Sequence, residues 1–233
     1  MKEAPWAMTQ EWHDVIFLHW PVSAQRLKDY IPKELEIDLF NGTAWIGLVL
    51  FQAKETRLRF LPPVPGIRSY TELNVRTYVT YKEQPGVYFF SLDADSLLAV
   101  KAAGAGGFLP YRQARMKMAE NKGAWKFKSR RTHKGTFPES LSLSYRVAAE
   151  PIHRSHLEIW LTERYCLWTK PKKKLLRVDI SHSQWNLYDI EGEIRVNSMA
   201  SFLPENLHAE RPLAHYGGSK KVRFFPPVVE KEN

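Results

Sequence analysis

The sequence predicts a mainly β protein (α+β, with a few short helices) whose antiparallel strands form a closed or strongly coiled sheet. Short segments with apolar side chains at every second position dominate the chain, and turn signals separate them. Fifteen prolines and 12 glycines are spread over the 233 residues, which suits many short elements joined by turns. No internal repeat or low-complexity linker interrupts the pattern, so we expect one domain over residues 1–233.

The expected strands can be placed by their alternation. They are residues 14–20, 35–39, 43–59, 70–81, 87–93, a pair flanking residues 120–123, residues 141–147, and two further pairs around residues 170–174 and around Glu191-Gly192. Asn41-Gly42 between two such runs is a strong hairpin signal, and Gln84-Pro85-Gly86 predicts a second turn. Residues 111–120 fit a strand of a hairpin but also fit a helix, and periodicity leaves both open.

Three short helices are expected between the strands. Ser23 can cap a helix over residues 24–30, and a second helix over residues 96–103 precedes glycines at 104, 106 and 107. Ser155 can cap a third helix that ends near Arg164, since Leu157, Trp160 and Leu161 would share its apolar face.

Composition points to the cytoplasm. The single cysteine, Cys166, permits no internal disulfide and reads as a core residue. The first residues lack the apolar core of a secretory signal, and the longest apolar run, residues 44–51, is too short to span a membrane. We therefore expect neither secretion nor a membrane partner.

The net charge of +9 is concentrated in two basic clusters, residues 126–134 and 170–174. Such clusters can neutralise phosphates, but lysines at solvated hairpin ends also protect strand edges. The second interpretation is favoured, so nucleic acid is not the expected partner. The alternative that remains is nucleic-acid binding by residues 126–134, with Trp125 and Phe127 interleaved among the cations.

The segment 71–79 is the most informative for function. Alternation places Glu72, Asn74 and Arg76 on one face of a strand, together with Tyr78, and apolar residues on the other. The sequence alone favours a solvated polar face. If this face lined the interior instead, its carboxylate and guanidinium could shift each other's pKa and form a site.

Further candidates lie on the following segments. Asp93 ends a strand on the same face as Ser91 and Asp95, and Tyr111 and Arg112 follow the extended segment that begins at Gly106-Gly107. The sequence contains no phosphate-binding glycine loop, no His-Glu-x-x-His and no pair of cysteines. We therefore expect no metal and no cofactor.

Several motifs together resemble the uncharacterised YqjF-like family over nearly the whole chain. They are His19-Trp20-Pro21, Asn41-Gly42-Thr43-Ala44-Trp45, Glu72-x-Asn74-x-Arg76, Pro85-Gly86 through Asp93, Leu109-Pro110-Tyr111, Trp160 through Tyr165, and His182-Ser-x-Trp185. That family looks related to the acetoacetate decarboxylase-like superfamily. The resemblance implies an antiparallel β-barrel or double cone around a small pocket, and a homo-oligomer.

The resemblance also implies where chemistry would occur. In acetoacetate decarboxylases a lysine after a Gly-x-Pro segment forms a Schiff base with the keto acid, and a strand carboxylate, matched by Glu72, faces it. Here Tyr111 and Arg112 follow Pro110, and the nearby Lys101 and Lys117 do not match the motif. A phenol and a guanidinium form no imine, so we expect no Schiff base.

Our leading hypothesis is a small-molecule pocket protein, with an organic acid or carbonyl compound as ligand and substrate. Glu72 and Tyr111 would be the catalytic pair, as acid/base and hydrogen-bond donor. The residues expected to bind the ligand are Arg76, which would hold its carboxylate, and Asn74, Asp93 and Arg112. A non-catalytic ligand-binding module remains the other alternative beside nucleic-acid binding.

Overall fold

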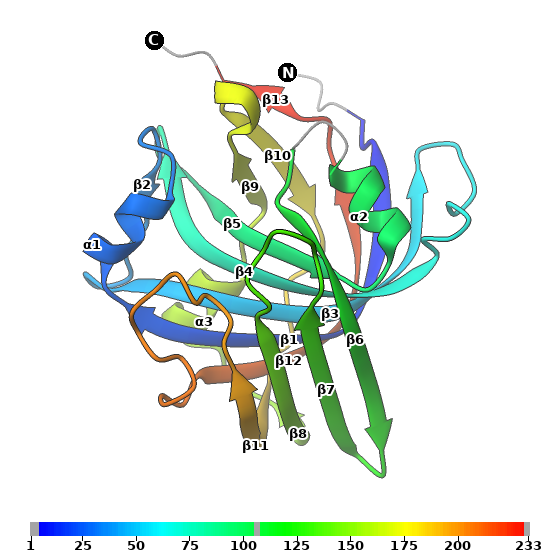
Figure 1. The fold of residues 1–233 in the computed structure, drawn as a ribbon, viewed down its shortest axis with the longest axis vertical. Helices are drawn as coiled ribbons and strands as arrows, with labels where there is room; N and C mark the ends of the chain where they lie inside the picture. Colours follow the sequence, from blue (N-terminus) through cyan, green and yellow to red (C-terminus); the bar gives the residue numbers. More distant parts are fainter. Residues whose placement is uncertain (1–4, 105–107, 231–233) are drawn as a thin grey trace.

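The hydrogen-bonded strands form one sheet that closes on itself (Figure 1). The computed structural model describes residues 5–104 and 108–230. The strands within these ranges are β1 (Met8–Val22), β2 (Glu36–Ile37), β3 (Ala44–Leu58), β4 (Ser69–Tyr81), β5 (Gln84–Ala94), β6 (Tyr111–Asn121), β7 (Ala124–Arg131), β8 (Ser140–Pro151), β9 (Cys166–Thr169), β10 (Leu176–Ser181), β11 (Tyr188–Asn197), β12 (Leu213–Phe224) and β13 (Val228–Val229).

The ring of pairings runs β5-β6-β7-β8-β11-β12-β1-β3-β4 and returns to β5. Strands β9 and β10 form a second connection, because β9 pairs with β5 and β10 pairs with β12. All pairings are antiparallel except two short ones, β5 with β6 and β5 with β9. The predicted closed, antiparallel, mainly β architecture is therefore confirmed.

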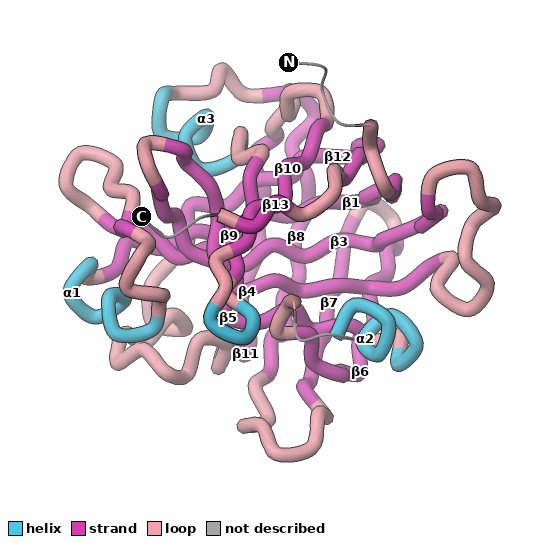
Figure 2. Tube along the Cα trace, turned by 90° about the horizontal axis from the view of Figure 1, so that it is seen from above, coloured by secondary structure: helices cyan, strands magenta, loops and turns pink. Residues whose placement is uncertain are grey.

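Helical segments are few and short. They are α1 (Ala24–Leu27), α2 (Leu97–Gly104), α3 (His156–Thr162) and the 3-10 turns η1 (Lys28–Tyr30) and η2 (Pro171–Lys173). The α-helices lie at the periphery of the strands (Figure 2). In α3, Ser155 accepts from the backbone N–H of Leu157 and Glu158 caps the Ser155 N–H, which confirms the predicted cap. No helix in the described ranges is long and apolar enough to cross a membrane.

The three long strands β1, β3 and β4 bear apolar packing on both faces. On one face, Leu18, Leu48 and Val75 belong to a cluster that includes Phe127 and Leu143 of the β6-β7-β8 hairpins. On the other face, a second cluster gathers Val15, Phe17, Val49 and Phe51 around Trp185 and Leu187. Because β4 lies between β3 and β5 within this arrangement, residues 70–79 are all buried.

Two predicted turns differ in detail from the structure. The β4–β5 turn lies at Lys82 and Glu83, both with positive φ, and Gln84 already pairs with Tyr81. Asn41-Gly42 does form a two-residue turn, with reciprocal backbone hydrogen bonds between Phe40 and Thr43. The strand before this turn then leaves β3, because β2 pairs with β4 instead.

Residues 111–120 form a strand, β6, so the helical alternative was wrong. The turn expected at Glu191-Gly192 was also wrong, since β11 runs straight through it and Gly192 pairs with Tyr145 of β8. The turn predicted at residues 170–174, which we call the lysine turn, falls at η2. Lys172, Lys173 and Lys174 are exposed, as predicted. Lys170, however, forms an ion pair with Glu34. Gly106-Gly107 lies outside the described residues.

Gly192 is required by the close approach of β8, which generates a stability prediction. A Cβ at position 192 would lie 2.1 Å from the Ser144 carbonyl oxygen, a rigid backbone atom. We expect Gly192→Ala to lower the free energy of unfolding by about 3 kcal/mol, through forced displacement of β11. Gly104→Ala is the control, because its Cβ would meet nothing within 4 Å. Urea denaturation compares them; equal stability of the two variants would contradict this account.

Candidate active site

A cavity of about 620 Å³ lies between the central strands and the strands β9 and β10, on the face of β4 that points away from the main apolar cluster. We call it the inner cavity. Its polar lining residues are Gln10, Thr56, Tyr70, Glu72, Asn74, Arg76, Tyr111, Thr162, Arg164, Thr169 and His182, and most of the remaining wall is aliphatic or aromatic. A largely apolar cavity with a few convergent polar groups is typical of small-molecule sites.

Strand β4 supplies the central polar row of this cavity. Glu72, Asn74 and Arg76 alternate along one face and all three line the inner cavity. They are 4%, 6% and 9% exposed, so the solvated face favoured by the sequence is wrong. The reason is tertiary: β9, β10 and the segment around Trp185 cover this side of the central strands.

Glu72 is paired with Tyr111 across the cavity wall. The Tyr111 hydroxyl donates to Glu72 Oε2 at 3.0 Å. Burial raises the pKa of the Glu72 carboxyl to about 7, although the hydrogen bonds from Tyr111 and Asn74 oppose the rise. Burial, together with the Glu72 charge, also raises the pKa of Tyr111 well above its usual value, so its hydroxyl stays a donor. Glu72 can therefore gain or lose a proton near neutral pH.

Arg76 is a buried cation without a carboxylate partner among the described residues. Its Nη2 donates to the Leu161 carbonyl oxygen at 3.2 Å, and its guanidinium lies 5.8 Å from the Phe17 ring centre. Its buried Nε has no hydrogen-bond partner, and neither does the buried Oδ1 of Asn74. A ligand could supply the missing hydrogen-bond partners of these two atoms.

Gly47 creates the room for this arrangement. Gly47 of β3 lies in register between His19 of β1 and Arg76 of β4. A Cβ on Gly47 would lie 3.1 Å from His19 Cδ2 and 3.4 Å from the Tyr78 hydroxyl. The glycine therefore leaves room for the His19 ring beside Arg76 and for the hydroxyl of Tyr78, two residues further along β4.

Sequence analysis missed several residues of the cavity. Tyr70 lies two positions before Glu72, and its hydroxyl accepts from Gln10 Nε2 at 2.9 Å. The signal for Tyr70 was present, since it continues the alternation of the polar face. Arg164, which is held by Asp38 at 2.6 Å, and His182, whose pKa burial lowers, lie in motifs noted above. Nothing in local sequence indicated that they reach the same cavity.

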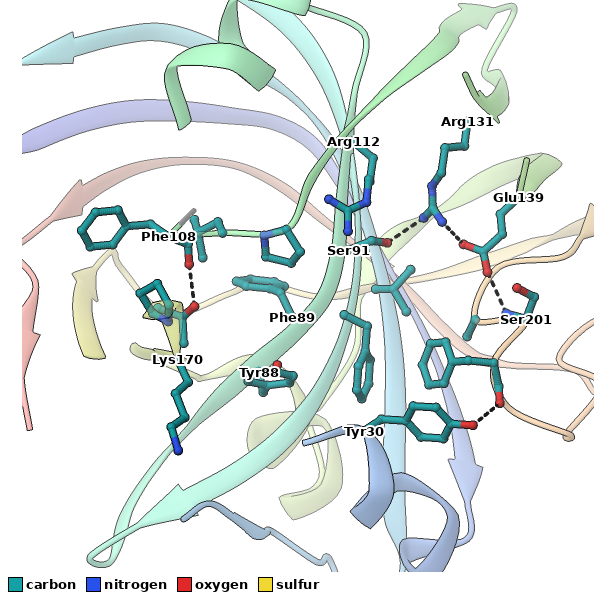
Figure 3. Close-up of a pocket in the computed structure, with 18 residues that line it drawn as sticks. Tyr30, Tyr88, Phe89, Ser91, Phe108, Arg112, Arg131, Glu139, Lys170 and Ser201 are labelled. Atoms are coloured by element: carbon teal, nitrogen blue, oxygen red, sulfur yellow. Dashed lines mark hydrogen bonds and ion pairs between the residues drawn. The ribbon is translucent and has the colours of Figure 1, made fainter. Parts of the chain in front are cut away.

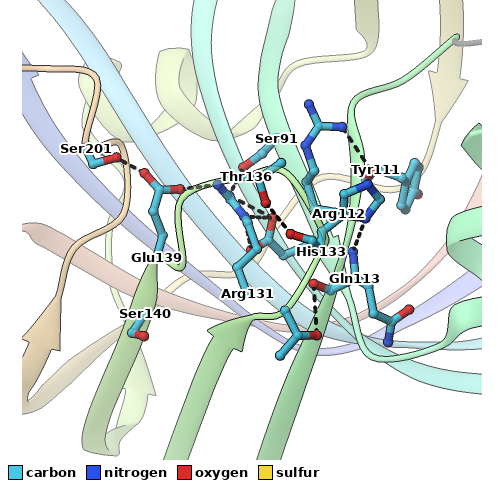
Figure 4. Close-up of polar contacts among 12 residues, drawn as sticks. Ser91, Tyr111, Arg112, Gln113, Arg131, His133, Thr136, Glu139, Ser140 and Ser201 are labelled. Carbon is cyan, nitrogen blue, oxygen red and sulfur yellow. Dashed lines mark hydrogen bonds and ion pairs between the residues drawn. The ribbon is translucent and has the colours of Figure 1, made fainter.

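Asp93 and Arg112 lie on the other side of the β5–β6 pair. Asp93 receives a bidentate ion pair from Arg131, which also contacts Glu139 at 2.5 Å and Ser91 at 2.8 Å (Figure 4). Burial raises the pKa of Asp93, and Arg131 opposes that rise. The structure thus brings Glu72, Asn74, Arg76 and Tyr111 together but separates Asp93 from them.

Arg112 instead lines an outer groove of about 580 Å³, near Phe89 and Ser91 (Figure 3). Its Nη1 donates to the Tyr111 carbonyl oxygen at 3.2 Å. Strand alternation explains the separation: Leu92 and Tyr111 pair and face the inner cavity, whereas the next pair, Asp93 and Arg112, faces away from it.

No lysine is among the described residues that line the inner cavity, and both Lys101 and Lys117 are exposed. Within the same described ranges, no group of three His, Cys, Asp or Glu side chains is placed to hold a metal ion. The aromatic residues of the basic stretch point inward: Phe127 is fully buried, and Trp125 packs against the same core cluster. In the alternative of nucleic-acid binding by residues 126–134, these two rings therefore do not share the exposed face of the cations.

Solved structures of known proteins show the class of fold. An acetoacetate decarboxylase-like enzyme from Sphingomonas wittichii RW1 matches with a TM-score of 0.65 at 14% identity, covering 98% of this chain and 95% of that one. Acetoacetate decarboxylase from Legionella pneumophila matches with a TM-score of 0.67 at 12% identity, covering 99% and 90%. The enduracididine biosynthesis enzyme MppR, complexed with pyruvate, matches at 0.63 and 13%, covering 98% and 91%. The fold is therefore acetoacetate decarboxylase-like.

The family is defined by sequence. The model of DUF2071, described as an uncharacterized conserved protein, matches residues 9–222, and the chain belongs to this family. Uncharacterized protein YqjF of Bacillus subtilis (strain 168) is 43% identical over 223 residues, which cover 95% of this chain and 91% of that protein. The resemblance inferred from the motifs is confirmed.

The raised pKa of Glu72 predicts how stability varies with pH. An unfolded glutamate titrates near 4.5 and folded Glu72 near 7, so between these values only the folded state holds the proton. This proton binding stabilises the folded state by about 3 kcal/mol relative to an ordinary glutamate. The full contribution is present below about pH 4.5, and it is lost as the pH rises through 7. Glu72→Gln should abolish this part of the pH dependence. Denaturant melts between pH 4 and pH 8, which bracket the two pKa values, measure the free energy of unfolding at each pH. If this free energy varies with pH in the same way for wild type and variant, the assignment is wrong.

Proposed function

We propose that the inner cavity binds a small organic acid with a carbonyl group next to its carboxylate, and that Glu72 transfers a proton to and from this ligand. The observation that carries the proposal is Arg76, a buried cation with no carboxylate partner among the described residues, which lines the same cavity as the Glu72–Tyr111 pair. An uncompensated buried charge costs several kcal/mol, and a ligand carboxylate would offset that cost.

The ligand would lie along β4. Glu72 and Arg76 are four residues apart on one strand, so their Cα atoms are about 13 Å apart. Their side chains line the cavity together with Asn74, whose Oδ1 has no hydrogen-bond partner. A carboxylate bound by Arg76 would place the adjacent carbonyl toward the Tyr111 hydroxyl, which can donate to it.

The reaction class that fits is proton abstraction next to a carbonyl. Ionised Glu72 would accept a proton from the carbon beside the carbonyl, and the C–H electron pair would form the enolate C=C bond while the carbonyl π pair moves to oxygen. Tyr111 would move its single O–H hydrogen bond from Glu72 to that oxygen. Return of the proton from Glu72 to carbon completes the cycle, so no oxidant or co-reactant is needed.

Two observations support this chemistry over a Schiff-base reaction. The described wall of the inner cavity contains no lysine, and the residue after Pro110 is a tyrosine bonded to the candidate base. MppR, which shares the fold, was solved with pyruvate, and this makes 2-oxo acids the first ligands to test.

Proton transfer can be measured directly. In D2O, wild-type protein should accelerate exchange of the methyl protons of pyruvate, followed by NMR, and the rate should rise with pH through about 7 as Glu72 ionises. Glu72→Gln should reduce the exchange rate by about 100-fold or more, because it removes the base. Arg76→Ala should raise the pyruvate concentration needed for half-maximal rate. Glu36→Gln, at an exposed glutamate on β2, is the control and should behave as wild type.

The same experiment separates an enzyme from a non-catalytic module. If pyruvate and longer 2-oxo acids raise the melting temperature of wild type but not of Arg76→Ala, while no exchange occurs, the cavity binds without catalysis. If neither binding nor exchange depends on Arg76 or Glu72, the proposal is wrong.

Absence of a Schiff base has its own test. Borohydride reduction in the presence of pyruvate or acetoacetate should leave the intact mass of the protein unchanged, because the amines of Lys101 and Lys117 are exposed and lie outside the described lining of the inner cavity. A stoichiometric adduct mapped to either lysine would restore the decarboxylase mechanism.

A further inference from the structure

The β6–β7 hairpin presents five cations on one exposed face. Arg115 and Lys117 of β6 lie beside Lys126, Lys128 and Arg130 of β7, and all five side chains are exposed. We call these five residues the basic face. The register places Arg115 directly opposite Arg130 and Lys117 directly opposite Lys128. None of the five forms an ion pair with any described residue.

This arrangement is unfavourable for folding. Like charges directly opposite one another on a sheet are destabilising. Protection of a strand edge would explain cations on β6, which beyond Gln113 pairs only with β7 among the described strands. It does not explain β7, which lies between β6 and β8 and has no free edge. Three of the five cations are on β7, so the basic face requires another explanation.

The surroundings leave its field uncancelled. The neighbouring strand β8 continues the same face with Ser140, Ser142 and Ser144, which pair with Arg130, Lys128 and Lys126 respectively. On this face the nearest acidic side chain in the register is Glu193 of β11, opposite Ser144, and it forms an ion pair with Arg195. Glu120 of β6 alternates to the other face, opposite Trp125. On the opposite face of the hairpin, Phe127 is buried in the main apolar cluster, and this packing holds the backbone that carries the cations in place.

We propose that the basic face binds the phosphodiester backbone of double-stranded nucleic acid without reading its bases. Lysine, arginine and serine side chains are the usual donors to phosphate oxygens. Successive cations on β7 are about 6.6 Å apart, and the two strands are about 5 Å apart, so the face carries a dense positive charge toward a densely charged polyanion.

The same residues argue against other anionic partners. Trp125 and Phe127 point into the core, so the face offers no ring on which single-stranded bases could stack. Its apolar members in this register are Ala119 and Ala124, which give no side chain long enough to enter a lipid bilayer. The cores of protein–protein interfaces are depleted of lysine, which disfavours an acidic protein.

Fluorescence anisotropy with a short labelled duplex of mixed sequence tests the proposal. Five phosphate contacts predict a slope of log affinity against log salt of about −4.5, which is roughly a 500-fold loss between about 50 and about 200 mM salt. In the variant Lys126→Gln/Lys128→Gln/Arg130→Gln the slope should fall to about −1.8. Duplex DNA and duplex RNA are both measured, since their backbones share this chemistry.

The lysine turn provides a matched control. Lys172→Gln/Lys173→Gln/Lys174→Gln removes the same charge from another exposed segment, so its affinity and slope should stay within about twofold of wild type. Equal losses in the two triple variants would show that bulk charge alone acts, and the proposal would fall. It would also fall if phosphatidylserine vesicles bind with this dependence on the three β7 cations while neither duplex binds.

Thermal unfolding excludes a trivial loss of structure. The β7 variant should melt at or above the temperature of wild type, because it removes two opposed pairs of like charge. A clear fall in its melting temperature at low salt would show that the three cations stabilise the hairpin, contrary to the proposal.

Discussion

Strand β4 is covered on both faces, and the chemistry of this protein depends on that constraint. One face packs Leu73 and Val75 into the main apolar cluster, and the alternate side chains line the inner cavity, which β9 and β10 cover. Those side chains include a carboxyl group and a guanidinium. Removing a charged group from water costs several kcal/mol. The carboxyl group can avoid this cost by becoming neutral, whereas the guanidinium cannot. Glu72 has a pKa raised to about 7, so it can become neutral, and its proton is consequently available near physiological pH. Arg76 retains its charge because a guanidinium is not deprotonated in proteins. Its described neighbours include the Leu161 carbonyl oxygen and the rings of Phe17 and Tyr78, but no carboxylate partner.

The β5–β6 pair separates two environments within one layer of backbone. Tyr111 contributes its hydroxyl to the inner cavity, while Arg112 turns to the outer groove. On β5, Asp93 also points away from the inner cavity, but it is fully buried, and Arg131 pairs with both Asp93 and Glu139. This ion-pair network connects β5 to β7 and to the segment before β8. Asp93 therefore has a structural explanation that does not involve the ligand of the inner cavity.

The inner cavity and the basic face lie on opposite sides of the main apolar cluster. Phe127 and Leu143 fill the space between the β6-β7-β8 hairpins and the central strands, and the inner cavity lies beyond those strands. A polyanion on the basic face would therefore leave the proposed ligand site unobstructed. The two proposals rest on different residues, and each can fail without affecting the other.

Much of the fold was determined by the sequence, because strand alternation and helix caps are local properties. The strands from β3 to β8, the capped helix α3 and the common face of Glu72, Asn74 and Arg76 all follow from side-chain period and turn chemistry. The motifs also identified the family. Only the tertiary structure decided whether that polar face meets water, since burial depends on which distant strands cover it. It also decided that Gly192 continues a strand, that Asp93 and Arg112 face away from the inner cavity, and that Arg164 and His182 reach it. These outcomes depend on register and on contacts between segments far apart in the chain, and local sequence carries no information about either.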